Sequence, residues 1–115
     1  MRKSGQIILF PFPQANLASG KTRPALLLGK LPGPYGDWLI CMISSQLHQY
    51  IKDFDEIVDT DDPDFDNSGL KTPSVIRVGR VAVVEESILL GAVGEIDADR
   101  LKRIKENLSD WLNKS

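Results

Sequence analysis

The sequence predicts a small, mainly β domain that ends in one amphipathic helix. Short apolar runs separated by proline and glycine fill the first three quarters of the chain, as is typical of strands joined by turns. Only the last segment carries apolar residues at helical spacing. With 115 residues the chain suffices for one hydrophobic core, so we expect a single domain over residues 1–115. This pattern fits an α+β protein or a small barrel with a helical lid.

Three strands are expected in the first half of the chain. Residues 6–12 form an apolar run that prolines close, because proline cannot donate to a sheet ladder. Residues 14–22 are small and polar and predict a loop, and residues 25–28 predict a buried second strand. Prolines and glycines at residues 32–36 predict a turn before a third strand at residues 38–44.

The second half begins with an acidic segment and a long β-branched run. Residues 53–66 hold eight acids and no lysine or arginine, which fits either a solvated loop or an acidic flap beside a basic surface. Residues 74–84 alternate in polarity and predict one bent strand or two short ones. Continuous alternation would place Arg77 and Arg80 on opposite faces, and Gly79 is the natural bend.

The final segment predicts a helix that covers one face or end of the sheet. Asp97 offers an N-cap just ahead of the helical periodicity. The expected buried stripe, with Trp111 in the core, comprises Leu101, Ile104, Leu108, Trp111 and Leu112. The other sides are expected to carry the basic residues Arg100, Lys102, Arg103 and Lys105.

The charge of the chain is unevenly distributed. Its formal net charge is −2, but outside residues 53–66 there are 14 basic residues against 8 acidic ones. The remainder is therefore basic enough for contact with a nucleic acid. No apolar run approaches the roughly 18 residues that span a bilayer, and the N-terminus does not resemble a signal peptide, so we expect a cytoplasmic protein.

Most familiar catalytic centres lack their residues here. One histidine and one cysteine cannot build a zinc site, and Cys41 lies in an apolar run that predicts a buried side chain. No glycine-rich phosphate loop is present, and residues 59–64 break the spacing of a calcium loop. We therefore expect no metal and no cofactor.

The residues that remain are cations and hydroxyls at strand ends. Arg23 stands at the start of the second strand, and Ser44 ends the third. Cleavage of RNA by its own 2′-hydroxyl requires groups that stabilise phosphate charge and shuttle protons, and arginine binds phosphate oxygens in pairs. The same pattern also fits an arginine in a surface ion pair and an ordinary strand-ending serine.

Four segments carry a resemblance to a known family. Residues 5–13 form a glycine-led strand ending in F-P-F, and residues 21–28 read K-T-R-P-A-L-L-L. Residues 43–46 resemble an I/V-T-S strand end, and residues 69–77 resemble a G-L-K-x-P-S-V-V-R segment. In this order and spacing the segments resemble the PemK/MazF toxin family over most of the chain.

The resemblance implies an SH3-like β-barrel with a C-terminal helix that works as a homodimer. It implies a metal-independent endoribonuclease toxin of a type II toxin–antitoxin system, which cuts single-stranded mRNA by 2′-hydroxyl attack and is blocked by a cognate antitoxin. By position, Arg23 corresponds to the family's transition-state stabiliser and proton donor. Ser44 stands where the family usually has threonine, and Arg77 matches an arginine with an acid role in some members.

Further residues are candidates for contact with single-stranded RNA. These contacts combine a cationic groove with aromatic platforms. The candidates are Phe12, Lys21, Gln46 and Ser74, with Tyr50, Phe54 and Phe65 as further possible platforms. His48 lies just past the third strand and fits either a proton shuttle or an exposed polar residue.

Two positions depart from the family pattern and keep other functions open. Ser44 lacks the methyl group that stiffens threonine, and Gly79 stands where some members carry an aspartate proposed as a base. The alternatives are a non-catalytic SH3-like binding module, or an inactive toxin relative, that binds an antitoxin-like peptide. A gyrase-poisoning toxin of the related CcdB type is a third.

Overall fold

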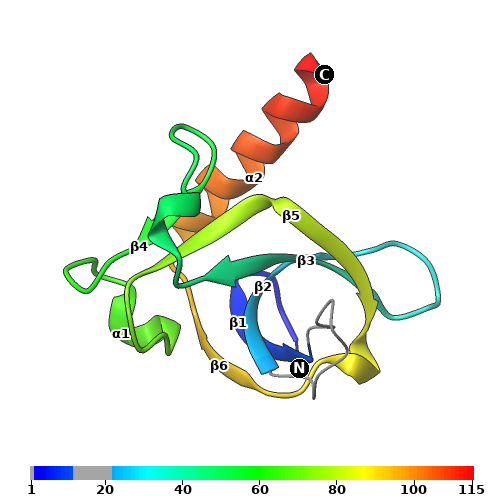
Figure 1. Cartoon of the computed structure of the whole chain (residues 1–115). Helices are drawn as coiled ribbons and strands as arrows, with labels where there is room; N and C mark the ends of the chain where they lie inside the picture. The colour runs from blue at the N-terminus through cyan, green and yellow to red at the C-terminus, as the bar shows by residue number, and fades with distance from the viewer. Residues whose placement is uncertain (1, 12–21) are drawn as a thin grey trace, which may run out of the picture.

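The structure, a computed structural model, describes residues 2–11 and 22–115. Six strands form one curled sheet in the order β4-β5-β3-β2-β1-β6 (Figure 1). The strands are β1 Gln6–Pro11, β2 Thr22–Lys30, β3 Asp37–Ser44, β4 Glu56–Val58, β5 Ser74–Glu85 and β6 Ala92–Glu95. The helices are α1 Phe65–Ser68 and α2 Ala98–Lys114, with short 3-10 turns η1 Leu47–Gln49 and η2 Glu86–Ile88.

The predicted mainly β fold with a C-terminal helix is confirmed. The first three strands and the long β-branched strand lie where the apolar runs predicted them, and β5 is one continuous strand. Asp97 caps α2, since its carboxylate accepts a hydrogen bond from the backbone N–H of Arg100. Of the predicted loop at residues 14–22, residues 14–21 lie outside the described residues and Thr22 begins β2.

Two short strands were not predicted. β4 pairs with β5, and β6 pairs with β1, so these strands form the two ends of the sheet order. With three and four residues they are too short for a clear alternation of polarity. β4 also lies within the acidic segment, where charge obscures the strand pattern. Their pairing comes from the long neighbouring strands.

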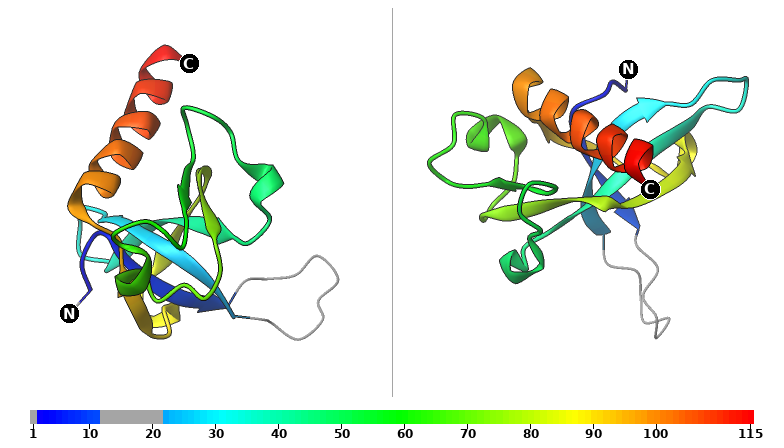
Figure 2. Two further views of the ribbon diagram at one scale, coloured as in Figure 1. Left: turned by 90° about the vertical axis from the view of Figure 1, so that its left-hand side faces the viewer. Right: turned by 90° about the horizontal axis from the view of Figure 1, so that it is seen from above.

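Helix α1 packs closely against β6. Gly69 has a left-handed backbone (φ +73°), and a side chain there would collide with the backbone of Val93. A side chain at Gly94 would meet the backbone of Asn67 and Ser68. Two glycines thus permit the contact that joins the far ends of the curled sheet. The result is a curled half-barrel with α2 across one face (Figure 2).

The two faces of the sheet bury separate apolar clusters. The cluster beneath α2 contains Ile7, Leu26, Leu28, Cys41, Ile43, Val58, Ile76, Val78, Ile96 and Ile104. The cluster on the opposite face contains Ile8, Phe10, Ala25, Leu27, Trp38, Ile40 and Leu89. Alternating residues of β2 and β3 therefore serve both clusters, as a sheet covered on both sides requires. Among the described helices, none has the length and apolar character needed to cross a membrane.

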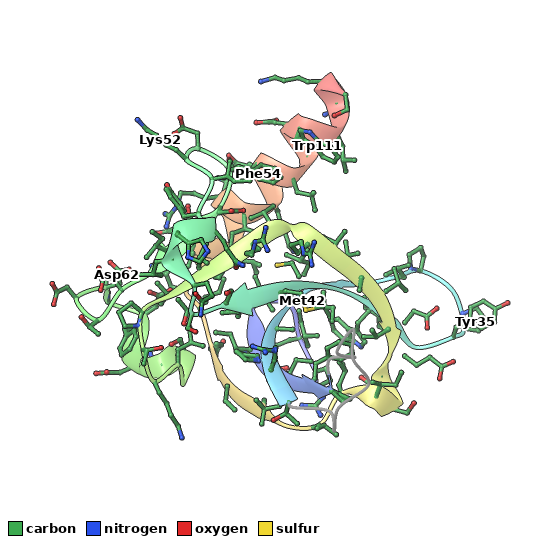
Figure 3. All side chains as sticks on the ribbon, in the orientation of Figure 1. Tyr35, Met42, Lys52, Phe54, Asp62 and Trp111 are labelled. Carbon is green, nitrogen blue, oxygen red and sulfur yellow. The ribbon has the colours of Figure 1, made fainter. Side chains whose placement is uncertain are left out.

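The prediction that Trp111 lies in the core is wrong. Trp111 is 52% exposed and Leu112 is 58% exposed, whereas Ile104 is fully buried. The last turns of α2 project past the sheet, so the apolar stripe continues beyond the surface that could cover it (Figure 1). Trp111 lies edge-on to the ring of Phe54, with ring centroids 6.3 Å apart (Figure 3).

The prediction that Arg100 lies on the solvent side of the helix is also wrong. Arg100 is only 6% exposed, and its guanidinium points into the acidic segment. It pairs with Asp64 at 2.8 Å and with Asp62 and Glu56 at 3.1 Å each. We call these four residues the Arg100 cluster.

Backbone groups complete the Arg100 cluster. The guanidinium also donates to the carbonyl oxygen of Ile57 (2.8 Å), and Asp64 accepts from the backbone N–H of Asp97 (3.1 Å). A buried charge with this many partners is compensated. Part of the acidic segment is therefore neither a solvated loop nor a free flap, because it holds the N-terminal end of α2.

Charge pairing shifts the ionisation of the cluster. Burial alone would raise the pKa of Asp64, but hydrogen bonds from Arg100 and the backbone N–H of Asp97 hold it below its ordinary value. Burial would lower the pKa of Arg100, but Asp64, Glu56 and Asp62 raise it. Both groups are thereby kept charged.

Arg100→Met is expected to lower the free energy of unfolding by about 3 kcal/mol, because it leaves buried carboxylates without their cation. Arg103→Met is the matched control, since Arg103 also pairs with Glu56 but is half exposed. It should cost at most about 1 kcal/mol. Urea denaturation of both variants measures the difference, and equal losses would contradict the buried cluster.

Asp64→Asn should reduce the loss of unfolding free energy that occurs as pH falls. Because the pKa of Asp64 is depressed in the folded state, its charge stabilises the fold above the ordinary value of 3.8. That stabilisation is lost as pH falls through the folded pKa. The wild type should therefore lose more unfolding free energy between about pH 7 and about pH 3 than Asp64→Asn does. Asp66→Asn, at an exposed position, should keep the wild-type slope.

Candidate active site

The pairing of β2 with β3 brings Arg23 and Ser44 together. Ala25 lies opposite Met42 in this antiparallel pair. Continuing the register by two residues places Arg23 across from Ser44. Side chains directly opposite in an antiparallel pair point to the same face of the sheet. The start of the second strand and the end of the third therefore meet, as the enzymatic hypothesis requires.

Strand β5 brings Arg77 to the same place. It pairs with β3 so that Arg77 lies opposite Met42 and Val75 lies opposite Ser44. Met42 and Ser44 share a face because they are two residues apart in one strand. The three predicted catalytic residues line one cavity of about 120 Å³. Its described lining consists of Arg23, Met42, Ile43, Ser44, Gln49, Arg77 and Arg80.

A bulge in β5 adds Arg80 to this cavity. The partner of Met42 is Arg77, but the partner of the preceding Cys41 is Val81. Three residues, 78–80, are therefore inserted between consecutive pairs, and this odd number reverses the alternation of the strand. Val81 takes the face of Cys41, so Arg80 takes the face of Met42. The expectation that Arg77 and Arg80 point to opposite faces is wrong for this reason.

Asp55 holds the bulge in place. Its carboxylate accepts hydrogen bonds from the backbone N–H groups of Val78 (2.9 Å) and Ile51 (3.0 Å), and the residue is 4% exposed. The bulge contains Gly79, as the sequence predicted for the bend. A Cβ atom at Gly79 would lie 3.2 Å from the ring of Phe54, a tight contact. Asp55 thus positions the backbone between the two arginines of β5.

Cys41 is buried beside this region, as predicted. Burial, together with the negative charge of Asp55, raises the pKa of its thiol to about 12. The side chain therefore stays a protonated thiol at neutral pH, which suits a packing role and not that of a nucleophile.

The cavity carries positive charge that no carboxylate neutralises. Over residues 2–11 and 22–115, the cations in ion pairs are Lys3, Arg100, Lys102 and Arg103. Arg23, Arg77 and Arg80 are not among them, so the alternative of a surface ion pair at Arg23 is excluded within this part of the chain. Three guanidinium groups around one small cavity make an anion site.

The strand end places a hydroxyl and an amide beside these cations. Ser44 Oγ accepts a hydrogen bond from the backbone N–H of Gln46 (3.0 Å). The chain then turns through η1, which returns Gln49 to the cavity. Within the described part of the chain, Gln49 Oε1 and Arg77 Nε are buried atoms without a hydrogen-bond partner. Both an acceptor and a donor are therefore available to a ligand.

The second-rank candidates are placed differently. Gln46 is exposed and supports Ser44 through its backbone, but it does not line the cavity. Ser74 is 5% exposed and its hydroxyl donates to the carbonyl oxygen of Thr72 (2.9 Å), so it does not line the cavity either. Phe12 and Lys21 lie outside the described residues.

The remaining aromatic and histidine candidates are also outside the lining. Phe54 and Phe65 pack partly buried against the core, whereas Tyr50 is 38% exposed. His48 is exposed. Sequence reasoning missed Gln49 and Arg80, because one depends on the path of a turn and the other on a bulge. The only signal for Arg80 was the glycine before it.

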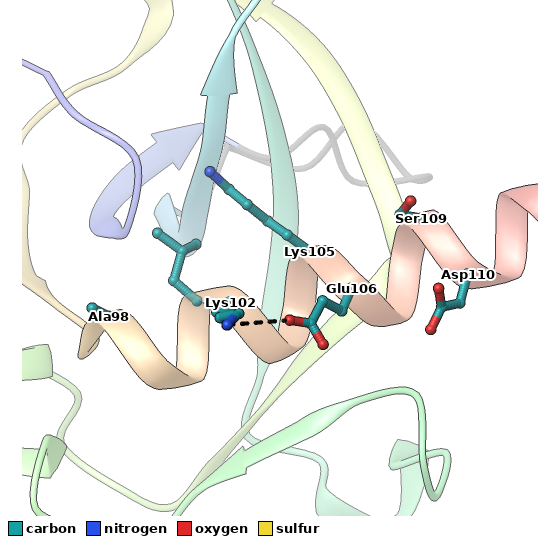
Figure 4. Close-up of a pocket in the computed structure, with 7 residues that line it drawn as sticks. Ala98, Lys102, Lys105, Glu106, Ser109 and Asp110 are labelled. Atoms are coloured by element: carbon teal, nitrogen blue, oxygen red, sulfur yellow. Dashed lines mark ion pairs between the residues drawn. The ribbon is translucent and has the colours of Figure 1, made fainter.

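A larger hollow of about 460 Å³ lies along α2 but has no comparable chemistry. All its lining residues belong to this one helix, and Lys102 pairs with Glu106 at 4.0 Å (Figure 4). Such an exposed pair, four residues apart, is an ordinary feature of a helix surface. No group of three metal-ligating side chains occurs among the described residues.

Several solved structures share this fold. MazF-mt6 of Mycobacterium tuberculosis aligns with a TM-score of 0.69 at 17% identity, covering 94% of this chain and 96% of that one. A MazE–MazF structure from Deinococcus radiodurans aligns with a TM-score of 0.72 at 23% identity, covering 99% and 97%. A mycobacterial endoribonuclease in complex with its cognate antitoxin aligns at 0.66 and 11% identity, covering 98% and 96%. The curled sheet with its helix therefore defines a protein of the MazF fold class.

The sequence itself identifies the family. Residues 3–112 match the family described as the PemK-like, MazF-like toxin of type II toxin–antitoxin systems. The chain belongs to this family, which confirms the resemblance seen in its motifs. A search of curated proteins found no match.

Asp55→Ala is expected to loosen the bulge that presents Arg77 and Arg80. The free energy of unfolding should fall by about 2 kcal/mol or more, because two backbone N–H groups lose their acceptor. Hydrogen exchange of the Val78 amide, measured by NMR, should accelerate. Asp61→Ala, at an exposed position, should change neither quantity. Unchanged exchange at Val78 in Asp55→Ala would show that the carboxylate does not hold the bulge.

Proposed function

We propose that this protein is a toxin of a type II toxin–antitoxin system that cleaves single-stranded RNA at specific sequences in the cytoplasm, without a metal ion. One observation carries the proposal. Three arginines that pair with no described carboxylate surround a cavity of about 120 Å³ that also contains the Ser44 hydroxyl. This combination suits an RNA phosphate, and family membership supports it.

The proposed reaction is attack of the 2′-oxygen on the adjacent phosphorus, with departure of the 5′-oxygen. This step yields a 2′,3′-cyclic phosphate and a 5′-hydroxyl. Arg23 and Arg77 donate hydrogen bonds to the phosphate oxygens, on which negative charge grows in the transition state. Ser44 Oγ already accepts a hydrogen bond from the backbone N–H of Gln46. In the proposed complex its hydroxyl donates a hydrogen bond to the phosphate. Arg80 holds a neighbouring phosphate at the rim.

Ser44 and Gly79, the two positions that depart from the family pattern, affect the proton transfers in the proposed reaction. The described lining contains no carboxylate and no imidazole. The 2′-hydroxyl proton therefore passes to water, and the leaving 5′-oxygen takes a proton from Arg23, which water restores. Serine keeps the hydroxyl that threonine would supply, with a less restricted rotamer.

RNA on either side of the scissile bond requires further contacts. Lys21 immediately precedes β2 and is proposed to bind a phosphate, with Gln46 and Phe12 as contacts to the bases. Ser74 has no role in this proposal, because its hydroxyl already donates a hydrogen bond to the carbonyl oxygen of Thr72. Sequence preference would arise from unstacked bases that these groups recognise.

We also propose a homodimer and an antitoxin as protein partners. The Deinococcus MazE–MazF and mycobacterial toxin–antitoxin structures support an antitoxin partner through their shared fold. Large apolar side chains exposed on β5 and the end of α2 support burial against another protein. They are Val81, Val83, Trp111 and Leu112.

Arg23→Ala is expected to slow cleavage of a defined single-stranded RNA by about 10²- to 10³-fold, the typical loss when one charge-stabilising donor is removed. The assay contains EDTA, and the products are mapped for 2′,3′-cyclic phosphate ends. Ser44→Ala should also be impaired, whereas Ser44→Thr should be active. Arg103→Ala, an exposed arginine on α2, should cleave like the wild type.

Two outcomes would contradict the proposal. Cleavage that requires added Mg²⁺ would exclude the metal-free mechanism. Tight binding of an antitoxin-like peptide without any RNA turnover would instead favour the non-catalytic binding module.

A further inference from the structure

Two buried atoms of opposite hydrogen-bonding character in the candidate active site have no partner among residues 2–11 and 22–115. Gln49 Oε1 can only accept a hydrogen bond, and Arg77 Nε can only donate one. Both residues line the same cavity. Buried polar atoms without a partner are unfavourable and rare in folded proteins. A ligand that forms hydrogen bonds with both atoms would remove this unfavourable free energy. The two atoms therefore indicate which hydrogen-bonding groups the ligand carries.

A phosphate alone does not meet the requirement. Its oxygens accept hydrogen bonds and match Arg77, Arg23 and Arg80. They have no proton for Gln49 Oε1, and would face it with negative charge. A ligand that pairs with Gln49 Oε1 in this amide orientation therefore carries a hydrogen-bond donor directly beside its phosphate.

The cavity volume narrows the choice of donor. About 120 Å³ is space for several waters. This space accommodates a phosphate and one adjacent hydroxyl. In RNA the ribose 2′-hydroxyl is the donor next to the 3′-phosphate, and DNA lacks it.

The turn after β3 fixes Gln49 relative to Ser44. The backbone N–H of Gln46 donates to Ser44 Oγ, and the backbone N–H of Gln49 donates to the carbonyl oxygen of Gln46 (3.0 Å each). The Tyr50 N–H then closes the turn on the carbonyl oxygen of Leu47 (3.1 Å). An amide and a hydroxyl are thereby held on one short, hydrogen-bonded segment at the cavity.

We propose that Gln49 is a positioning residue that recognises ribose: its Oε1 accepts a hydrogen bond from the 2′-hydroxyl of the nucleotide whose 3′-phosphate lies against Arg77 and Arg23. This inference rests on the proposed function, because it takes RNA as the ligand. No proton is transferred to the amide. Gln49 orients the 2′-hydroxyl in the bound ground state, and the hydroxyl then turns its one proton from Gln49 Oε1 to water as the attack begins.

The test uses ligands that cannot be cleaved. Ribonucleoside 3′-monophosphates of all four bases and their 2′-deoxy counterparts are titrated into the whole protein, and binding is followed by NMR chemical shifts. The wild type should bind the ribonucleotides about fivefold more tightly, the effect of one hydrogen bond. Gln49→Leu should bind both series equally.

Gln6→Leu is the matched control, because Gln6 is a glutamine outside the cavity whose side chain accepts a hydrogen bond from the backbone N–H of Lys3. It should keep the wild-type preference. Thermal unfolding verifies that each variant is folded. If Gln49→Leu does not fold, the ribose and deoxyribose comparison on the wild type still tests the inference.

The outcomes separate this inference from the proposed function. Equal binding of both series by the wild type, or a preference that survives in Gln49→Leu, would overturn the role of Gln49 even if RNA is cleaved. A Gln49-dependent ribose preference in a protein that cleaves no RNA would support the inference and overturn the enzymatic proposal. Failure of every 3′-phosphate to bind would overturn the inference, while the cleavage assay decides the enzymatic proposal separately.

Discussion

The ion pairs between Arg100 and three carboxylates of the acidic segment set the charge arrangement of the whole molecule. They hold the first turns of α2 against β4, and they engage Glu56, Asp62 and Asp64 away from the cavity. A fourth acid, Asp55, is fixed by backbone N–H groups. Part of the acidic segment therefore pairs with arginines of α2 or binds the backbone of the bulge, and among the described residues no carboxylate pairs with the arginines of the cavity. A net charge of −2 is thus compatible with a site for a polyanion.

The bulge in β5 gives the site its second special property. A regular strand could offer Arg77 or Arg80 to the cavity, but not both, since residues three apart point to opposite faces. The three inserted residues reverse the alternation and also supply Gly79, whose small size admits Phe54. Gly79 stands where some family members carry an aspartate proposed as a base, and in this chain that position lies within the bulge. The bulge adds a cation, Arg80, to the site and not a carboxylate.

Local signals in the sequence were sufficient for most of the architecture. Apolar runs located β1, β2, β3 and β5, and Asp97 located the start of α2. Arg23, Ser44 and Arg77 were placed by motif, and strand register brought them together as expected. The errors have a common cause, because Arg100, Arg80 and Gln49 each depend on a tertiary partner or a backbone irregularity. Charge alone assigned Arg100 to solvent, since no local pattern shows that acids 36 to 44 residues away surround it.

The order of the strands also determines when the molecule can be completed. The first strand lies between β2 and β6, so one of its edges stays unpaired until residues 92–95 are present. The Arg100 cluster likewise forms only once α2 is present. Such distant pairing requires nearly the entire chain before the fold closes. A chain still emerging from the ribosome has its cavity arginines and its acids but not Arg100. Under the proposed RNA-cleaving function, a finished site would therefore form only after the last helix has been synthesised.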